Sequence, residues 1–253
     1  MNYKNLCIIQ ARTGSTRLPE KVLLKVNGIP LLEYEIERVK QAKQLDKIVV
    51  ATTDHENDKK IKELCDRLEI DCFRGSENDV LDRYYQCSLK YPEYENIVRI
   101  TGDCPLIDPA VIDEAASLFE MEAYDYVSNV IEETFPDGMD VEVFNRHALN
   151  EAASKANLAS EREHVTLYIR NQKKFRQKNL SCRRNLGHFR LTVDNPEDLA
   201  VVEFLIKNSK LTDGYPHYIS LLEKNPAIML KNSHLSRNEG LQKSLREDGI
   251  STR

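Results

Sequence analysis

Residues 6–39 read LCIIQARTGSTRLPEKVLLKVNGIPLLEYEIERV, and most of the fold prediction depends on them. The stretch opens with an apolar run, which is typical of a strand buried on both faces. It closes with Leu32, Ile36 and Val39 at helical spacing, which predicts a helix over residues 29–42. A buried strand that leads through a loop into a helix is the first unit of an alternating β-α pattern.

This alternation continues through the first half of the chain. We predict strands over residues 5–11, 47–52, 71–75 and 96–103, and further helices over residues 57–70, 78–91 and 109–120. Asp108 is placed to cap the last of these helices, with Pro109 in its first turn. The order implies a parallel sheet covered by helices on both faces, in which ligands bind at the carboxyl ends of the strands.

The pattern changes after residue 120, where the strands are no longer each followed by a full helix. We predict strands over residues 124–130, 138–145 and 188–194, and helices over residues 158–172 and 196–208. Ser160 and Glu163 have the spacing of a capping box in the first of these helices. The predicted fold class is therefore α/β, with a mixed, mostly parallel sheet. We expect one domain over residues 1–230, followed over residues 231–253 by a polar segment that forms a surface helix and a frayed tail.

The composition argues against several classes of protein. The net charge of −5 does not suit bulk binding of nucleic acid, which usually requires a basic domain. No apolar run approaches the roughly 18 residues of a membrane-spanning helix, and the N-terminal apolar run is too short for a signal peptide. The six cysteines are scattered without a CxxC pair, so we interpret them as reduced thiols of a cytoplasmic protein and expect no zinc site.

The loop after the first strand, QARTGSTRLPEK, concentrates positive charge. Arg12, Arg17 and Lys21 can surround phosphate oxygens, while Gly14 and Ser15 let the backbone approach a ligand closely. The loop matches neither the Walker phosphate loop nor the dinucleotide motif GxGxxG. On charge alone, a solvated basic turn is an equal alternative. The position after a buried strand favours a phosphate site.

Two aspartates, Asp103 and Asp194, end predicted buried strands. Carboxylates at two strand ends, facing a basic loop, suit Mg²⁺, which takes one or two protein carboxylates together with phosphate oxygens and waters. The alternative for Asp103 is that it caps a turn, and Asp198 is expected in the first turn of a helix, where its charge favours the helix dipole. Together, the loop and the two carboxylates indicate metal-assisted attack on a nucleoside triphosphate.

Six stretches in this order resemble a known family. They read IIQARTGSTRLPEKVL, RGSENDVLDRYY, RITGDCPLIDP, PDGMDVEVF, SEREHVTLYI and RLTVDNPEDL. The chain is similar to the cytidylyltransferases that make CMP-activated sugars, which include CMP-Kdo synthetase and N-acylneuraminate cytidylyltransferase, and most of all to their spore coat polysaccharide biosynthesis branch. The resemblance implies a nucleotide-diphospho-sugar transferase fold, which is Rossmann-like and GT-A-like, a Mg²⁺ cofactor and a homodimer.

The resemblance also implies roles for individual residues. Nucleotide binding falls on Ala11, Arg12, Gly14, Ser15, Arg17, Lys21, Arg74, Arg83 and Asp103. Catalysis falls on Asp103, Asp194, Lys21 and Arg17, with Asp103 and Asp194 as the metal ligands. Binding of the acceptor falls on Asp140, Glu142, Glu161, Arg162 and His164. For His164, a structural hydrogen bond at a helix start is an equal alternative.

The implied reaction transfers CMP from CTP to a sugar acceptor, acidic or otherwise modified, and releases pyrophosphate for the synthesis of a surface polysaccharide or glycoconjugate. One residue departs from the family pattern: Glu20 stands where the family usually has glycine, and we expect its side chain to point to solvent. One alternative is another sugar or sugar-phosphate nucleotidyltransferase or a GT-A-like glycosyltransferase, although the sequence has no Asp-x-Asp triplet. Another is a non-catalytic protein that binds nucleotide or sugar, for which Glu20 is the support.

Overall fold

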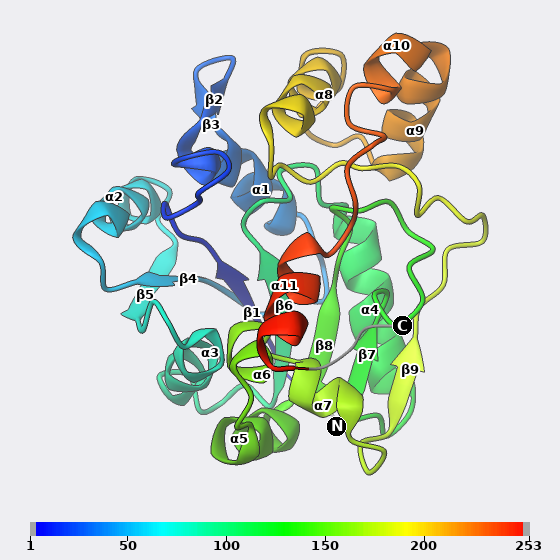
Figure 1. Ribbon diagram of the computed structural model, residues 1–253. Coiled ribbons are helices and arrows are strands. Elements are labelled where there is room, and N and C mark those ends of the chain that lie inside the picture. The colour runs from blue at the N-terminus through cyan, green and yellow to red at the C-terminus, as the bar shows by residue number, and fades with distance from the viewer. Residues whose placement is uncertain (1–3, 250–253) are drawn as a thin grey trace.

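The computed structural model describes residues 4–249, which form a seven-stranded mixed sheet and, beside it, a short hairpin (Figure 1). The order across the sheet is β5 (Asp71–Gly75), β4 (Lys47–Thr53), β1 (Asn5–Gln10), β6 (Asn96–Thr101), β8 (Glu142–Asn145), β7 (Tyr126–Ser128) and β9 (Gln177–Asn179). The first four strands are parallel, whereas β8 runs antiparallel to both β6 and β7. The predicted mixed, mostly parallel sheet is confirmed.

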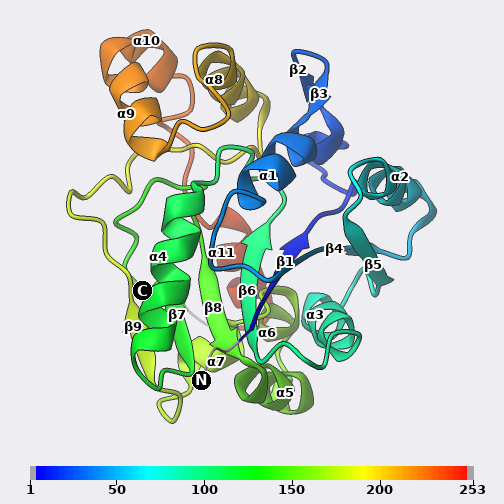
Figure 2. The same cartoon turned by 180° about the vertical axis from the view of Figure 1, so that it is seen from behind.

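Helices cover both faces of the sheet (Figures 1 and 2). The helices and 3₁₀ turns before the last strand are η1 (Lys21–Leu23), α1 (Leu31–Val39), η2 (Glu56–Asp58), α2 (Lys59–Arg67), α3 (Val80–Leu89), α4 (Pro109–Met121), α5 (Arg146–Lys155), α6 (Ala159–Glu163) and α7 (Leu167–Asn171). Because neighbouring strand residues point to opposite faces, Cys7 and Ile9 of β1 enter the core beneath α1 and α4, while Leu6 and Ile8 enter the core beneath α3 and α5. The apolar run that predicted a strand buried on both faces is explained by these two cores.

The predicted strand over residues 188–194 is wrong. This segment is extended but irregular, with one isolated bridge between Asp137 and Arg190. Its N–H groups bond in turn to different partners: that of Leu191 donates to the carbonyl of Asp137 (2.7 Å), and that of Val193 to the carbonyl of Asp103 (2.9 Å). The segment is therefore held between two loops instead of alongside one strand.

The predicted helix over residues 158–172 is two short helices, α6 and α7, separated at Val165, which has a positive φ of 49°. The predicted capping box is also wrong. Ser160 is buried inside α6, and it is Glu161 whose carboxylate accepts the N–H groups at the start of the helix, including that of Asn157 (3.2 Å). The sequence analysis also missed β9 and the hairpin of β2 (Lys25–Val26) and β3 (Ile29–Pro30).

After the sheet is complete, the chain forms α8 (Pro196–Lys207), α9 (Tyr215–Lys224) and α10 (Pro226–Met229), which gather at the same end of the molecule as the hairpin (top of Figure 1). The chain then returns as a segment that we call the C-terminal strap, residues 231–249, which contains α11 (Glu239–Glu247). The predicted surface helix is present, and it lies across β6 and β8 against α6 (Figure 1). The frayed tail predicted at the end of this segment falls, from residue 250 on, outside the described residues. None of the helices over residues 4–249 is long and apolar enough to cross a membrane.

Candidate active site

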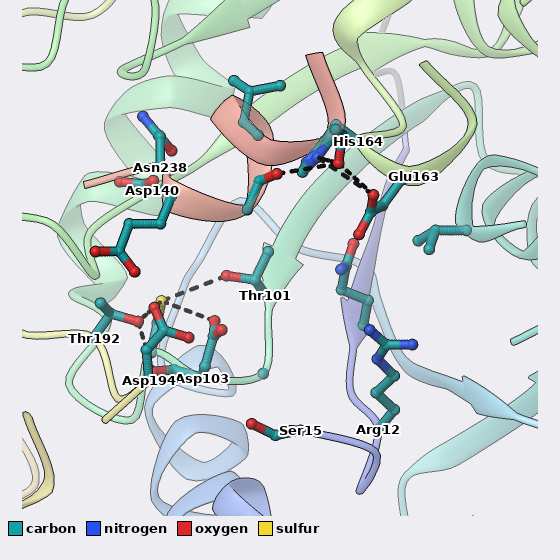
Figure 3. A pocket seen from close by; sticks show the side chains of 18 of the residues that line it. Arg12, Ser15, Thr101, Asp103, Asp140, Glu163, His164, Thr192, Asp194 and Asn238 are labelled. Carbon is teal, nitrogen blue, oxygen red and sulfur yellow. Dashed lines mark hydrogen bonds and ion pairs between the residues drawn. The ribbon is translucent and has the colours of Figure 1, made fainter. Parts of the chain in front are cut away.

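A cavity of about 670 Å³ opens at the carboxyl ends of β1 and β6. Its walls come from the loop after β1, from the start of the loop after β6, from β8, and from α6 and α11. A polar pocket of this size, at the strand ends of an α/β sheet, suits a small-molecule ligand. Figure 3 shows Asp103 and Asp194 together on one side of it, Arg12 and Ser15 on the loop after β1, and His164 with Glu163 across the opening.

Close contact between the ends of β1 and β6 fixes the floor of the cavity. The N–H of Gly102 donates to the carbonyl of Gln10 (2.7 Å). A Cβ at Gly102 would lie 2.8 Å from the Cβ of Ala11 and 2.9 Å from the Gln10 oxygen, so only glycine fits without moving the backbone. The turn that carries Asp103 is thereby held beside the loop that carries the cations.

Lys21 joins the two predicted metal ligands. Its Nζ lies 2.8 Å from a carboxylate oxygen of Asp103 and 2.7 Å from one of Asp194. Burial alone would raise the pKa of Asp103, but the Lys21 ammonium, assisted by hydrogen bonds, outweighs burial and lowers that pKa to about 2. For Lys21, burial alone would lower the pKa of the ammonium group, but the two carboxylates outweigh burial and raise that pKa. Asp103 and Lys21 are therefore both charged at neutral pH.

The irregular segment around residue 190 brings Asp194 to this place. Thr192 Oγ1 donates to the carbonyl of Asp103 (3.1 Å), which ties the two loops together. Arg190 is 7% exposed and donates to Asp137 (2.6 Å), Asp194 (2.9 Å) and Asp198 (2.8 Å). Asp198 does lie in the first turn of α8, as predicted, but it is a buried partner of Arg190. Arg190 thus gathers three carboxylates, of which only that of Asp194 belongs to the segment itself.

The cation-rich loop is anchored from beneath by a residue that the sequence analysis missed. Buried Asp58 accepts hydrogen bonds from the N–H (2.8 Å) and the Oγ1 (2.5 Å) of Thr13. The guanidinium of Arg12 lines the cavity and is about half exposed, 3.9 Å from Glu77. Arg17 forms an ion pair with Asp194 (3.0 Å) and donates a hydrogen bond to Glu239 of the strap (2.6 Å). Gly14, Ser15 and Ala11 also line the cavity.

Glu20 points away from this cavity. Its backbone is left-handed (φ 54°), and its carboxylate pairs with Lys60 of α2 at 2.5 Å. It lines a separate, smaller hollow and is absent from the wall of the main cavity. The added charge thus lies against a lysine instead of against a phosphate site.

Because a non-glycine residue in this conformation costs about 1 kcal/mol, we expect Glu20→Gly to increase the free energy of unfolding slightly and to leave nucleotide affinity nearly unchanged. Urea unfolding and nucleotide titration measure the two effects. Glu20→Ala, which removes the same charge but keeps the backbone cost, is the control. A large gain in nucleotide affinity in both variants would show that the carboxylate does act on the phosphate site.

The residues that the resemblance assigned to the acceptor separate into two groups. Asp140, Glu142 and His164 line the cavity, whereas Glu161 caps α6 and Arg162 pairs with Asp79 at the start of α3 (2.5 Å). The last two hold elements in place and do not reach the cavity wall. On the nucleotide side, Arg83 lines the cavity, but Arg74 donates to the carbonyls of Thr53 and His55 outside it.

Glu142 is the centre of a buried polar network that the sequence did not reveal. It is 3% exposed and accepts hydrogen bonds from Tyr126 (2.5 Å), Thr166 and Arg99. Burial would raise the pKa of Glu142, but Arg99 and Arg170 lower it. Arg99, Thr166 and Arg170 line the cavity as well, and so does part of the C-terminal strap between Ser236 and Glu247. Arg99 and Thr166 stand within two of the six stretches that carry the family resemblance, but the sequence analysis gave them no role, because their positions in the cavity depend on tertiary contacts.

His164 faces the strap. Its Nε2 lies 3.1 Å from the Ser244 hydroxyl, and burial lowers the pKa of its imidazole. His164 thus makes a structural hydrogen bond, as the alternative expected, but it lies at the C-terminal end of α6 and not at a helix start. Its position in the cavity wall is also compatible with contact to a ligand.

Comparison with known proteins agrees with this geometry. A family model described as cytidylyltransferase matches residues 6–229. An uncharacterized protein of Methanocaldococcus jannaschii, MJ1063, is 42% identical over 250 residues, with 96% of this chain and 98% of that protein covered. The spore coat polysaccharide biosynthesis protein SpsF of Bacillus subtilis is 35% identical over 233 residues, covering 87% of this chain and 95% of SpsF.

A solved cytidylyltransferase from Leptospira borgpetersenii superposes with a TM-score of 0.87 and 34% identity, over 93% of this chain and 100% of the other. The predicted nucleotide-sugar transferase type of fold is thereby confirmed, as is the predicted nucleotidyltransferase class. The chain belongs to the cytidylyltransferase family.

Proposed function

We propose that this protein transfers CMP from CTP to a sugar acceptor, with release of pyrophosphate and with Mg²⁺ as cofactor. The observation that carries the proposal is the set of Lys21, Asp103 and Asp194 at the joined ends of β1 and β6, with Arg12 and Arg17 on the same loop as Lys21. The description of the family supports CTP as donor, and the name of SpsF supports a product used in polysaccharide synthesis.

The residues present fit a magnesium ion. Asp103 and Asp194 already share one cation, the Lys21 ammonium, and residues 4–249 contain no group of three or more His, Cys, Asp or Glu side chains that could hold a metal. A site with two carboxylates needs its remaining ligands from phosphate oxygens and water, which is the usual coordination of Mg²⁺ at nucleotides. Bound there, Mg²⁺ would neutralise charge on the phosphates.

In the proposed reaction, a hydroxyl oxygen of the acceptor attacks the α-phosphorus of CTP, and the bond from that phosphorus to pyrophosphate breaks. Lys21 has a flexible stem, so it can exchange its carboxylates for phosphate oxygens when a metal ion takes them. Arg12 and Arg17 would grip the β- and γ-phosphates as planar forks. Most of the rate would come from positioning and from stabilising the charge of the leaving group.

The acceptor would lie beside Asp140, Glu142 and His164, where Arg170 adds a positive charge. This mixture of acids, bases and hydroxyl groups suits a sugar, and the arginine suits an acidic one. A dimeric assembly and a cytoplasmic location stay predictions from the sequence.

Thermal unfolding with CTP, UTP, ATP and GTP, each with and without Mg²⁺, tests the donor. A ligand that binds only the folded state stabilises it by about 2.7 kcal/mol at a hundredfold excess over Kd. We expect the largest rise in Tm for CTP with Mg²⁺. A larger rise in Tm with UTP or GTP would mean that this nucleotide, and not CTP, is the donor. No rise in Tm with any nucleotide would contradict the proposal and favour a protein without this activity.

Release of pyrophosphate from CTP in the presence of a panel of sugars, beginning with 3-deoxy-manno-octulosonate, then tests the acceptor. The panel also separates transfer from binding alone, because a non-catalytic nucleotide-binding protein would be stabilised by CTP and release no pyrophosphate. Glu20 was the support for that alternative, and its contact with Lys60 removes the support.

A further inference from the structure

The C-terminal strap is fixed to the rest of the protein on both sides of the cavity. Before α11, Arg237 pairs with Asp140 and donates to the carbonyl of Phe135 (3.2 Å). Toward the end of α11, Ser244 is 4% exposed and bonds to His164, and Asp248 accepts the N–H of Ser160 (3.0 Å). The strap is therefore a built wall of the cavity, although it lies beyond the residues 6–229 that the family model matches.

Between these anchors, Glu239 reaches across to the phosphate loop. Its carboxylate lies 2.6 Å from Nη1 of Arg17, while Nη2 of the same guanidinium lies 3.0 Å from Asp194. Both terminal nitrogens of Arg17 are thus occupied by carboxylates. Within residues 4–249, Glu239 forms no ion pair other than that with Arg17.

A phosphate that grips an arginine through both terminal nitrogens must displace whatever holds them. Asp194 would be drawn to a metal ion, but Glu239 has no such alternative partner among residues 4–249 and must separate from Arg17. Both side chains are nearly half exposed, and exposed ion pairs contribute little to stability, so the pair is weak enough to exchange.

We propose that Glu239 is a positioning residue that exchanges with the pyrophosphoryl group for Arg17. It holds the guanidinium in the nucleotide-free enzyme, gives way when the triphosphate binds, and returns to Arg17 as pyrophosphate leaves. This inference rests on the proposed function, because it takes the β- and γ-phosphates to lie at Arg17. Glu239 thereby lowers the affinity for ligands that carry a pyrophosphoryl group and favours release of that product.

The effect should depend on which phosphates a ligand has. CTP and free pyrophosphate must compete with Glu239, whereas CMP lacks the two phosphates and leaves the pair intact. We therefore expect Glu239→Gln to bind CTP and pyrophosphate about two- to fivefold more tightly than the wild type, with the affinity for CMP unchanged.

Isothermal titration of the full chain with CTP, pyrophosphate and CMP, each with Mg²⁺, measures these affinities without an acceptor sugar. The matched control is Glu223→Gln in α9, which removes the same charge from another exposed pair with an arginine, 2.7 Å from Arg184 and outside the cavity wall. Urea unfolding of the ligand-free variants confirms that both fold.

A double-mutant cycle with Arg17→Met assigns the effect to the pair, because Glu239→Gln should then change nothing further. Equal gains in Glu239→Gln and Glu223→Gln would show a general effect of net charge and overturn the inference. Unchanged affinities in Glu239→Gln would overturn it as well and leave the proposed function standing. A wild type that binds neither CTP nor pyrophosphate would overturn both.

Discussion

Asp103→Asn should lower kcat by about two to three orders of magnitude while the protein stays folded. The carboxylate lies at the joined ends of β1 and β6, within 2.8 Å of Lys21, and is charged at neutral pH because its pKa is lowered to about 2. An amide of the same shape keeps a hydrogen bond to Lys21 but supplies no negative charge to a metal ion. Removal of one preorganised electrostatic group from an active site typically costs this much in rate.

Pyrophosphate release at saturating CTP, Mg²⁺ and acceptor measures kcat, and urea unfolding checks the fold. Asp66→Asn makes the same change on the outer face of α2, where Asp66 pairs with Lys62, and should keep full activity. If Asp103→Asn turned over at near the wild-type rate, Asp103 would not be a metal ligand, and its alternative role in a turn would be the better account.

Lys21→Met should lower the free energy of unfolding by about 3 kcal/mol at neutral pH without Mg²⁺. The methionine fills similar space but leaves Asp103 and Asp194 facing each other without the cation they share. Removal of one partner from a buried ion pair costs about 3–5 kcal/mol, and the partial exposure of these carboxylates places the expectation at the low end. Activity should fall as well, because the same ammonium is proposed to bind phosphate.

Two conditions should reduce the difference in the free energy of unfolding between Lys21→Met and the wild type. Mg²⁺ can take the place of the ammonium, so millimolar Mg²⁺ should restore part of the lost stability. A lower pH should also reduce this difference in the free energy of unfolding. The stabilisation that the wild type gains from Asp103 is complete above the unfolded-state pKa of about 4 and disappears as the pH falls through about 2.

Urea unfolding between pH 7 and pH 2.5, with and without Mg²⁺, follows both effects. Lys60→Met is the control, since Lys60 forms an exposed pair with Glu20 and its loss should change the stability little. A difference that stays constant with pH and with Mg²⁺ would mean that Lys21 stabilises the fold by its packed stem and not by its charge.

The sequence was sufficient for the part of the fold that rests on apolar periodicity. The runs around Ile8 and Val49 are buried on both faces, so they form central parallel strands and look alike in sequence and structure. Asp103 follows one such strand, and its place at the carboxyl edge follows from topology alone. The turn Asn27–Gly28, with φ of 50° and 80°, was a readable hairpin signal that the sequence analysis did not use.

The other parts of the site depend on contacts between distant residues. The segment at residues 188–194 has the apolar alternation of a strand. Its one arginine, Arg190, binds three carboxylates, and these contacts hold the backbone in place of regular hydrogen bonding to a neighbouring strand. Asp58 supports Thr13 from 45 positions away, and Arg17 and Glu239 are 222 positions apart. No local pattern encodes such pairs, so the polar character of the strap predicted a surface helix and not a wall of the cavity.

The position of the strap in the sequence also has a consequence for folding of the nascent chain. Synthesis runs from the N-terminus at about 5–20 residues per second, and domains generally fold as units as they emerge. The seven strands are all complete by residue 179, whereas the strap begins at residue 231. A nascent chain can therefore hold its finished sheet and its phosphate loop while one side of the cavity still stands open. The protein would then become able to catalyse the reaction only when the strap docks, seconds after the sheet has formed.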